Sequence, residues 1–366
     1  MNVLAMFCYS SQGYIERIVF QQTKEKQTAY LNRLTKLLEM PQSSKTFLSV
    51  FSGGEIATSS FGPHAPELSE LWVPSRDKNR TIPVTCAYTR ETSVVQQSLL
   101  PVVMHFHCGG MTFGSVKAEL DKVRYIAAKS KSVVCSVEYR LAPEHPFPAG
   151  LNDAFDASMH LLSPVSANSS RSNLEHKLGI DVDLKKVATF GYSAGGYLSG
   201  LVARLLSEIG VRIGLQISIA PMVQPHEETK SMLKNWNAPV LTKGLNAFGW
   251  SIYLPNKELA SNFNVSLLAD LPEGLVAKMP PVYLQINTKD VLYSEGELYA
   301  NKLKSQGRLL AMDVFDTNHI GVMPGLLSRG GPGSLAFDKA VDTLVFWLEE
   351  EGDKHSKKQK TAAAQN

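Results

Sequence analysis

Short apolar runs alternate with amphipathic segments along most of the chain from residue 82 onward. Each run spans about four to eight residues rich in Val, Ile, Leu and aromatic residues, which is typical of buried β-strands. The runs are IPVTCAY, LLPVVMHF, SVVCSVEY, KVATFGY, RIGLQISIA, PVYLQIN and LAMDVF. Segments with helical character lie between most of them, at 117–130, 149–163, 195–208, 294–306 and 335–350. Strands that are apolar on both faces and alternate with helices predict a parallel sheet covered on both sides, an α/β doubly wound fold.

Three segments depart from this alternation. Residues 24–40 carry Leu and Tyr at helical spacing, and Pro41 predicts the end of that helix. The stretch 222–280 is too long for a plain crossover between strands, and its LNAFGWSIYL run has helical character. We therefore expect an inserted subdomain there. Residues 351–366 lack apolar periodicity and are rich in Lys, so we expect a disordered basic tail.

The composition is that of an ordinary globular protein, with 44% hydrophobic and 19% charged residues among 366. The net charge is only +3, and the tail carries part of it, which argues against nucleic acid as a partner. The Cys residues show no CxxC spacing, so neither a zinc nor a redox motif is indicated. No apolar run is long enough for a membrane span, and the first residues lack the basic start of a secretory signal. We therefore expect a reduced, cytoplasmic protein.

The segment GYSAGG, residues 191–196, places the pattern Gly-x-Ser-x-Gly between a predicted strand and a predicted helix. In this context the pattern is typical of a nucleophile elbow, a sharp turn that lifts a serine hydroxyl clear of the sheet. Ser193 is then the candidate nucleophile. Gly191 and Gly195 would avoid side-chain clashes in the turn, and the amide of Ala194 would face a developing oxyanion. The motif alone leaves open a Gly-rich turn with an idle serine.

A serine nucleophile needs a base to take its proton and a third group to orient that base. With this kind of elbow, the acid and then the histidine are expected on loops after later strands. Asp290 follows the PVYLQIN run and His319 follows LAMDVFD, which fits this order. The alternative role for Asp290 is to cap the helix that follows it. Asp316 is a rival acid, but it lies so close to His319 in sequence that we prefer Asp290.

The stretch HFHCGG, residues 105–110, ends a predicted buried strand and raises two interpretations. His105, His107 and Cys108 suggest a metal, but strand alternation points Cys108 away from the two histidines, which makes a poor chelate. We therefore predict no metal. Gly109 and Gly110 lack side chains, so their amides can approach an acyl oxygen closely. His107 is expected to brace this loop through its ring nitrogens.

At this point the chain resembles the hormone-sensitive-lipase-like branch of the α/β-hydrolases, which includes carboxylesterases and lipases. The matching segments are HCGGMTFGS, VEYRLAPEHPFPA, GYSAGG, KDVLYSEGELYANKL and NHIG, within roughly residues 100–350. The resemblance implies an eight-stranded, mostly parallel sheet with a helical cap. It also places Ser193, Asp290 and His319 at the family's triad positions. Its oxyanion donors correspond to Gly109, Gly110 and Ala194.

Four positions depart from the family pattern. Cys108 stands where the family's first loop glycine is usual, and Tyr192 where an acidic residue is frequent before the nucleophile. Ile320 replaces a glycine after the histidine, and Ser294 stands where an acid is common. None of these changes removes a catalytic group. We expect Cys108 either to narrow the acyl pocket or to make the enzyme sensitive to thiol reagents.

The resemblance and the motifs together predict a serine carboxylic-ester hydrolase acting on short- to medium-chain acyl esters. Its domains would be a cap-forming segment at 1–75, a catalytic domain at 76–350 with a cap insertion at about 222–270, and the tail. The expected partner is a small-molecule ester, without a cofactor, and a homodimer is kept as one option. Amide or lactone hydrolysis on the same residues, or a non-catalytic small-molecule receptor of this fold, are the alternatives.

Overall fold

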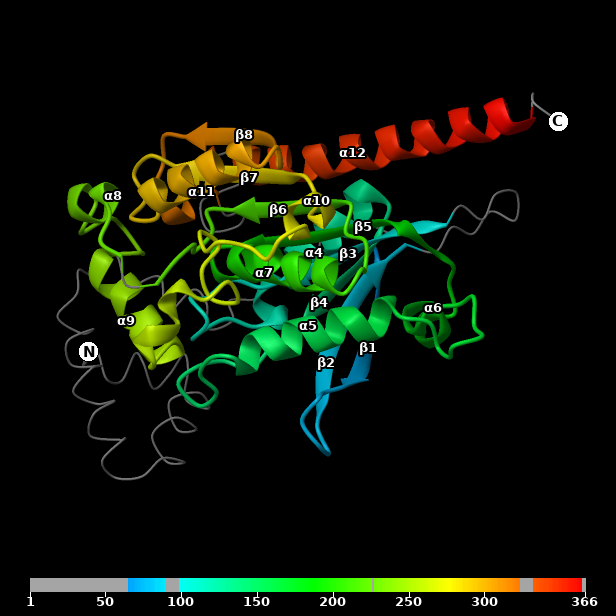
Figure 1. Ribbon diagram of the computed structural model, residues 1–366, viewed down its shortest axis with the longest axis horizontal. Helices are drawn as coiled ribbons and strands as arrows, with labels where there is room; N and C mark the ends of the chain where they lie inside the picture. Colours follow the sequence, from blue (N-terminus) through cyan, green and yellow to red (C-terminus); the bar gives the residue numbers. More distant parts are fainter. Residues whose placement is uncertain (1–64, 90–98, 226, 323–331, 364–366) are drawn as a thin grey trace.

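The computed structural model describes residues 65–89, 99–225, 227–322 and 332–363, and its centre is one eight-stranded sheet (Figure 1). The strand order is β1-β2-β4-β3-β5-β6-β7-β8. Strand β2 is antiparallel to both β1 and β4, and every other neighbouring pair is parallel. The expected mostly parallel sheet is confirmed. The strands are β1 (Glu67–Pro74), β2 (Thr81–Tyr88), β3 (Leu100–Phe106), β4 (Val133–Val137), β5 (Val182–Tyr192), β6 (Leu215–Ile219), β7 (Val282–Asn287) and β8 (Leu309–Phe315).

Strand β1 is the strand that the apolar runs did not predict. It pairs with β2 along its whole length, so the expected boundary of a cap-forming segment at residue 75 is wrong: residues 67–74 belong to the sheet. At this outer edge only Leu71 and Val73 are buried, and charged or polar residues interrupt the run. An edge strand with one solvated face therefore shows too weak an apolar signal. Residues 1–64, with the helix expected at 24–40, lie outside the described residues.

Helices cover both faces of the sheet, as the alternating pattern predicted (Figure 1). On one face α5, α7 and α11 pack into a core cluster with strand residues such as Val102 and Leu284. On the other face α4 and α12 pack against residues such as Val103 and Phe190. The helices of these layers are α4 (Val116–Ser130), α5 (Ala149–Leu162), α7 (Ala194–Glu208), α11 (Tyr293–Ser305) and α12 (Pro332–Ala363). A short α6 (Asn173–Leu178) precedes β5.

Helix α12 runs on to Ala363, through residues for which the sequence predicts a disordered tail. The backbone there is helical, which corrects that expectation for residues 351–363. The physical reason is local: Ala, Lys, Glu and Gln are strong helix formers, and they can extend a helix without an apolar stripe.

The stretch between β6 and β7 contains short helices of its own: α8 (Lys230–Lys234), α9 (Lys243–Tyr253), η3 (Lys257–Ser261) and α10 (Leu275–Lys278). Helix α9 coincides with the LNAFGWSIYL run and is capped by Thr242, whose hydroxyl accepts a hydrogen bond from the amide of Leu245. Its buried Trp250 packs edge-on against Tyr197 of α7, with ring centroids 5.4 Å apart. This contact packs the insertion against α7.

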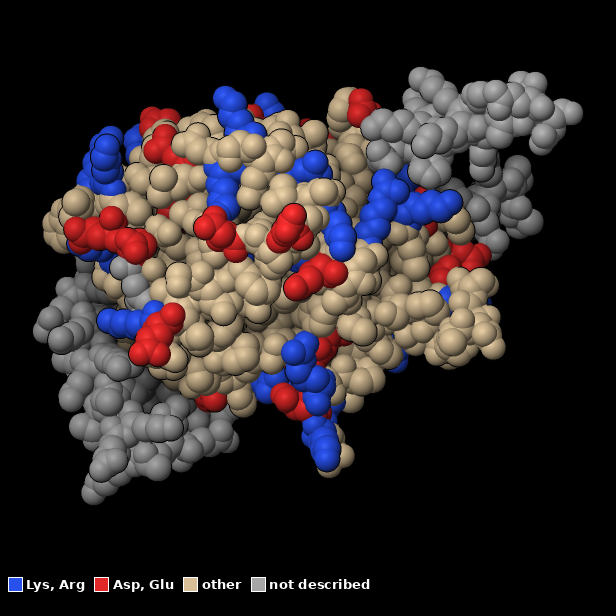
Figure 2. Space-filling view, in the orientation of Figure 1, with Lys and Arg blue, Asp and Glu red and all other residues tan. Residues whose placement is uncertain are grey.

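Acidic and basic side chains are intermixed on the face shown in Figure 2. Within the described part of the chain, no helix is both long and apolar enough to cross a membrane.

Candidate active site

Ser193 sits on a strained turn between β5, which ends at Tyr192, and α7, which begins at Ala194. Its φ of 55° and ψ of −118° are rare for a residue with a side chain. A Cβ added at Gly191 would lie 2.2 Å from the backbone of Gly195. One added at Gly195 would lie 1.9 Å from the carbonyl oxygen of Phe106. Both glycines are therefore required by the close packing of the turn, as the motif suggests.

The surrounding backbone holds this turn in place. The amide of Ser193 donates to the carbonyl of Ile219 at 2.8 Å, and its own carbonyl accepts from the amides of Tyr197 and Met222. Ala194 is the first residue of α7, a position whose amide has no partner inside the helix. That amide is therefore free of intrahelical bonding where a negative oxygen could bind.

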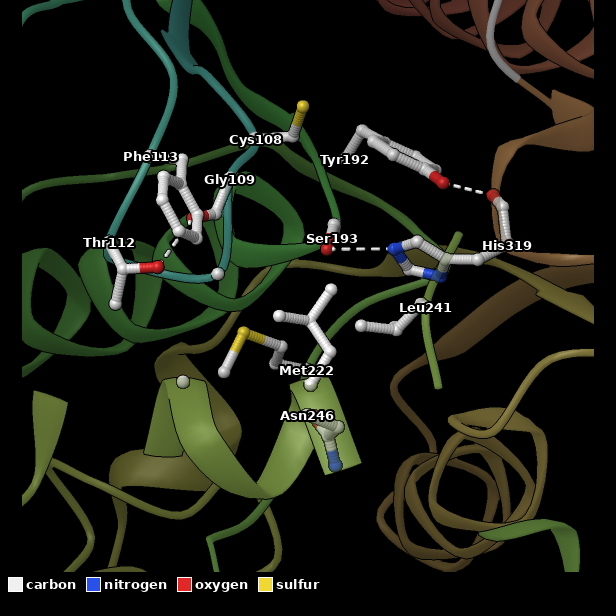
Figure 3. A pocket seen from close by; sticks show the side chains of 13 residues that line it. Cys108, Gly109, Thr112, Phe113, Tyr192, Ser193, Met222, Leu241, Asn246 and His319 are labelled. Carbon is white, nitrogen blue, oxygen red and sulfur yellow. Dashed lines mark hydrogen bonds between the residues drawn. The ribbon is translucent and has the colours of Figure 1, made fainter. Parts of the chain in front are cut away.

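His319 joins Ser193 to Asp290. Its Nε2 lies 3.0 Å from the Ser193 Oγ, and its Nδ1 lies 2.5 Å from an Asp290 carboxylate oxygen (Figure 3 shows the first contact). All three side chains are buried. They follow β5, β7 and β8, so three segments distant in sequence meet where parallel strands end. The carboxylate accepts a hydrogen bond from the N–H at Nδ1, which leaves the lone pair of Nε2 able to accept a proton from the serine.

The loop of Asp290 is held from two sides. The second carboxylate oxygen accepts from the amide of Leu292 at 3.0 Å, so Asp290 also stabilises the turn into α11. The side-chain amide of Asn235 donates to the carbonyls of Asp290 at 2.8 Å and Thr288 at 3.2 Å. Asn235 ends α8, so the insertion contributes directly to the placement of the acid. No sequence pattern pointed to this asparagine.

Asp316, the rival acid, binds Lys289 and Thr288 instead of His319. It forms an ion pair with Lys289 at 2.8 Å and accepts from the Thr288 hydroxyl at 2.6 Å. Its carboxyl is exposed, and hydrogen bonds from Lys289 and Thr288 lower its pKa. It therefore acts as a surface partner of Lys289 rather than of the histidine.

The loop after β3 is anchored by His107. Its Nδ1 donates to the carbonyl oxygen of Cys108 at 2.8 Å, and its ring stacks on that of Tyr139 with centroids 4.1 Å apart. The Tyr139 hydroxyl in turn donates to the carbonyl of His107 at 2.7 Å. Tyr139 belongs to the VEYRLAPEHPFPA segment, which therefore packs behind this loop. His107 is in the position expected for a brace.

This bracing orients the next peptide. In a trans peptide the C=O and N–H point in opposite directions, so fixing the carbonyl of Cys108 also fixes the amide of Gly109. Gly109 has a φ of 129°, and a Cβ there would lie 2.1 Å from the carbonyl oxygen of Phe113. Gly110 follows with a φ of 60°. Both glycines line the same pocket as Ser193.

No group of three or more His, Cys, Asp or Glu side chains among the described residues is arranged to hold a metal ion. His105 Nε2 lies 3.5 Å from a carboxylate oxygen of Glu119 on α4, and Cys108 is buried in the apolar cluster on the α4 side of the sheet, so the two side chains do not point oppositely as expected. The reason is that β3 ends at Phe106, and the chain turns before Cys108. His107 contacts Tyr139 instead.

The pocket beside Ser193 is small and mostly apolar. Its volume is about 30 Å³, and Met222, Leu241 and Leu245 form much of its wall (Figure 3). Helix α9 lies close above the loop after β3: a Cβ at Gly249 would be 3.5 Å from the carbonyl oxygen of Gly110. Residues of the insertion therefore line the same pocket as Ser193.

Tyr192 is a further residue of the site that sequence reasoning noted only as a departure from a pattern. Its hydroxyl donates to the backbone carbonyl of His319 (Figure 3). Its position in the sequence could have pointed to this role, because the residue before the elbow serine ends β5 and lies beside the loop after β8.

Comparisons with known proteins give the family of this chain. The model of a family described as alpha/beta hydrolase fold matches residues 103–323. The chain is 28% identical over 251 residues to the carboxylesterase NlhH of Mycobacterium tuberculosis. The matched region covers 66% of this chain and 74% of that protein. It is 31% identical over 214 residues to the esterase LipI of the same species, covering 58% and 62%.

Among solved structures, the thermostable carboxylesterase EstE1 from a metagenomic library is 28% identical, with a TM-score of 0.67 over 84% of this chain and 95% of that one. An esterase of the archaeon Pyrobaculum calidifontis is 26% identical, with a TM-score of 0.67 over 94% and 97%. The chain therefore belongs to the alpha/beta hydrolase fold family and is a hydrolase of the carboxylesterase type found among its relatives.

Proposed function

We propose that this chain is a serine carboxylic-ester hydrolase in which Ser193 is the nucleophile, His319 the general base and Asp290 the residue that orients the base. The observation that carries the proposal is the continuous hydrogen-bonded chain from Ser193 through His319 to Asp290. A serine hydroxyl is a weak nucleophile unless such a base is aligned with it.

The reaction proceeds in two halves. Ser193 Oγ attacks the ester carbonyl carbon while His319 Nε2 takes its proton, and the tetrahedral intermediate collapses as the same proton passes to the leaving alcohol. A water molecule then attacks the acyl-enzyme, gives a proton to His319, and releases the carboxylic acid and Ser193. Asp290 stays ionised and stabilises the imidazolium that forms in each half.

The amides of Gly109, Gly110 and Ala194 are the proposed oxyanion donors. They come from the braced loop after β3 and from the start of α7, so they are positioned before substrate arrives. Donors that need no rearrangement lower the barrier most effectively. The positive end of the α7 dipole acts in the same direction.

The small apolar pocket favours short- to medium-chain acyl groups. We assign the segment at about 222–270 the role of a cap, because α9 lies over Ser193 and the residues Leu241 and Leu245 form part of the wall. Amide or lactone hydrolysis uses the same machinery and is the second candidate. A non-catalytic receptor is disfavoured, because all three triad side chains are present and aligned.

The test is hydrolysis of p-nitrophenyl esters from acetate to long chains by the full chain and by Ser193→Ala. We expect activity on the shorter esters and a loss of at least about 10⁴-fold in kcat for the variant. Absence of activity on every ester, or full activity in the variant, would refute the proposal. Parallel assays on matched anilides and lactones separate ester hydrolysis from the second candidate.

A further inference from the structure

The loop that carries His319 departs from the family pattern at the residue that follows the histidine. Ile320 stands there instead of a glycine, and the proposed reaction does not explain how this loop keeps its shape. His319 is the first residue of a short 3₁₀ turn, η4 (His319–Val322). An imidazole can bridge a serine and a carboxylate only while the backbone beneath it stays in place. The groups that fix this turn therefore contribute to the reaction.

The chain leading to His319 is tied to the loop after β7. The amide of Lys289 donates to the carbonyl of Thr317 at 3.0 Å. One residue earlier, the amide of Thr288 donates to the carbonyl of Phe315 at 2.9 Å. These bonds continue the pairing of β7 with β8 beyond the ends of both strands. The N-terminal side of the turn is therefore fixed to the loop that carries the acid.

The side chain of Asn318 holds the turn on the other side of His319. Its Oδ1 accepts hydrogen bonds from the amide of Ile320 at 3.2 Å and from the amide of Gly321 at 3.1 Å. The carbonyl of Asn318 also accepts from the amide of Gly321, at 3.2 Å. The amides at the start of a helical turn have no partner within it, so an Asn at this position acts as its cap. Asn318 therefore closes a small ring of hydrogen bonds around the backbone of His319.

Ile320 and Gly321 both fit the turn that Asn318 caps. The side chain of Ile320 is buried in the apolar cluster on the α4 and α12 side of the sheet. A Cβ at Gly321 would lie 1.7 Å from the Oγ1 of Thr317, so a side chain there would collide with this residue. The departure from the family pattern has a physical reason here. The apolar side chain anchors the turn in the core, and the glycine is needed one position later.

The peptide between His319 and Ile320 is held at both ends. Its carbonyl accepts the hydrogen bond from the Tyr192 hydroxyl, and its amide donates to the Oδ1 of Asn318 (Figure 3 shows the first contact). The C=O and N–H of a trans peptide point in opposite directions, so these two bonds fix the rotation of the peptide plane. Loss of the Asn318 bond would leave this peptide free to rotate about its contact with Tyr192, and the attached imidazole would move with it.

We propose that Asn318 is a positioning residue, whose side-chain oxygen fixes the turn η4 and keeps the imidazole of His319 aligned with the serine and the acid. This inference rests on the proposed function, because it assigns Asn318 a role in the same reaction. Asn318 acts through the backbone of His319 and takes no part in making or breaking bonds. Its removal should therefore slow the chemical steps and leave substrate binding largely unchanged.

The experiment measures kcat and KM on p-nitrophenyl butyrate for Asn318→Ala, Asn318→Ser and Asn318→Asp. Asn, Ser and Asp are caps of similar strength, whereas Ala has no side-chain acceptor for the turn. Moving a catalytic group by about 1 Å can cost about 10²-fold, so a partial loosening should cost about tenfold. We expect Asn318→Ala to lose about tenfold in kcat with little change in KM. Asn318→Ser and Asn318→Asp should stay within about threefold of the parent, because each keeps an acceptor.

The matched control is Asn256→Ala. Asn256 caps the 3₁₀ helix η3 at an exposed position, where its Oδ1 accepts from the amide of Glu258 at 3.1 Å. Both Ala variants lose the same kind of cap, so urea unfolding should show similar losses of stability. Only Asn318→Ala should lose kcat. A loss of kcat in Asn256→Ala as large as in Asn318→Ala would mean that general destabilisation is the cause, and would overturn the positioning role.

Labelling of Ser193 by diethyl p-nitrophenyl phosphate provides a second readout. The serine oxygen bonds to phosphorus, p-nitrophenolate leaves, and the serine proton passes to His319. This step needs the imidazole in place but no attack by water, so its rate constant should fall about tenfold in Asn318→Ala, together with kcat. If Asn318→Ala does not fold, Asn318→Gly takes its place, because Gly also lacks the acceptor but disturbs a cap position much less. A labelling rate and kcat equal to those of the parent in that variant would overturn the proposal.

The failure of this inference is distinguishable from failure of the proposed function. An inactive Ser193→Ala with an Asn318→Ala variant that matches the parent in kcat and labelling rate would remove the positioning role alone. A Ser193→Ala variant that keeps activity would remove both.

Discussion

The hydroxyl of Tyr192 donates a hydrogen bond to the backbone carbonyl of His319, and the two rings lie 5.1 Å apart. Tyr192 directly precedes Ser193 in the chain. The contact therefore ties the strand that carries the serine to the loop that carries the histidine, independently of the hydrogen bond between their side chains. This contact helps to keep the imidazole at 3.0 Å from the serine.

Tyr192→Phe should therefore reduce activity without removing any proposed catalytic group. We expect kcat to fall about three- to tenfold, and the free energy of unfolding to fall by about 1–2 kcal/mol, because a buried carbonyl loses its donor. Steady-state kinetics and urea unfolding measure the two effects. The matched control is Tyr125→Phe, which loses a hydrogen bond of 2.5 Å to Asp338 between α4 and α12. Equal losses of kcat in both variants would contradict the specific role of Tyr192.

Asp290 and Asp316 provide a paired test of the acid. Asp290→Asn should lower kcat by about 10³–10⁴-fold, because the amide cannot hold the imidazole in the required tautomer or stabilise its positive form. Asp316→Asn should stay within about twofold of the parent, since its carboxylate contacts Lys289 at the surface. Ester hydrolysis at saturating substrate measures both. A large loss in the Asp316 variant would count against the assignment.

Leu245 should set the length of the acyl chain that fits. It is buried in the wall of the pocket, so Leu245→Ala opens space beside Ser193. We expect kcat/KM for octanoate relative to butyrate p-nitrophenyl esters to rise about tenfold, the scale of a few methylene groups in an apolar pocket. Leu233→Ala on α8, where the side chain is 56% exposed, is the control and should leave the ratio unchanged. An unchanged ratio in Leu245→Ala would show that another wall limits the acyl group.

Because of Glu295, the free energy of unfolding should decrease as the pH rises. This carboxyl on α11 is fully buried, and one oxygen accepts from the amide of Val223 at 3.1 Å. Burial raises its pKa well above the ordinary value of 4.5; the bond from Val223 opposes this, and the charge of Asp290 adds to it. The folded protein therefore keeps this proton above pH 4.5, where the unfolded chain releases it. Its contribution to stability is complete below that pH and is lost as the pH rises toward the folded pKa.

Glu295→Gln removes this titration and keeps an acceptor for Val223. We expect the variant to gain on the parent by about 1.4 kcal/mol for each pH unit above about pH 5. Urea unfolding at several pH values between about 5 and 7.5 measures the difference. Glu297→Gln, at an exposed position on the same helix, should show no such trend. A difference that stays constant with pH would mean that Glu295 is ionised in the folded protein.

Some of the site could be located from local pattern alone. Strand runs that are apolar on both faces predict buried parallel strands, and their ends predict where polar loops gather. Ser193 could be identified because a turn this sharp requires Gly191 and Gly195, and that requirement is written in adjacent residues. Strand β1 could not be predicted because only one of its faces is buried. The helical tail could not be predicted because helix propensity needs no apolar stripe.

The amino-acid sequence by itself determined the α/β alternation, the elbow around Ser193 and the glycine-rich loop after β3. Only the tertiary structure decided that Asp290 rather than Asp316 meets His319, and that Tyr192 and Asn235 hold the two loops. The physical reason is the distance along the chain over which each kind of interaction acts. Periodicity and turn strain act over a few neighbouring residues, whereas these contacts join segments that come together only when the parallel strands align their carboxyl ends and the helices close over them.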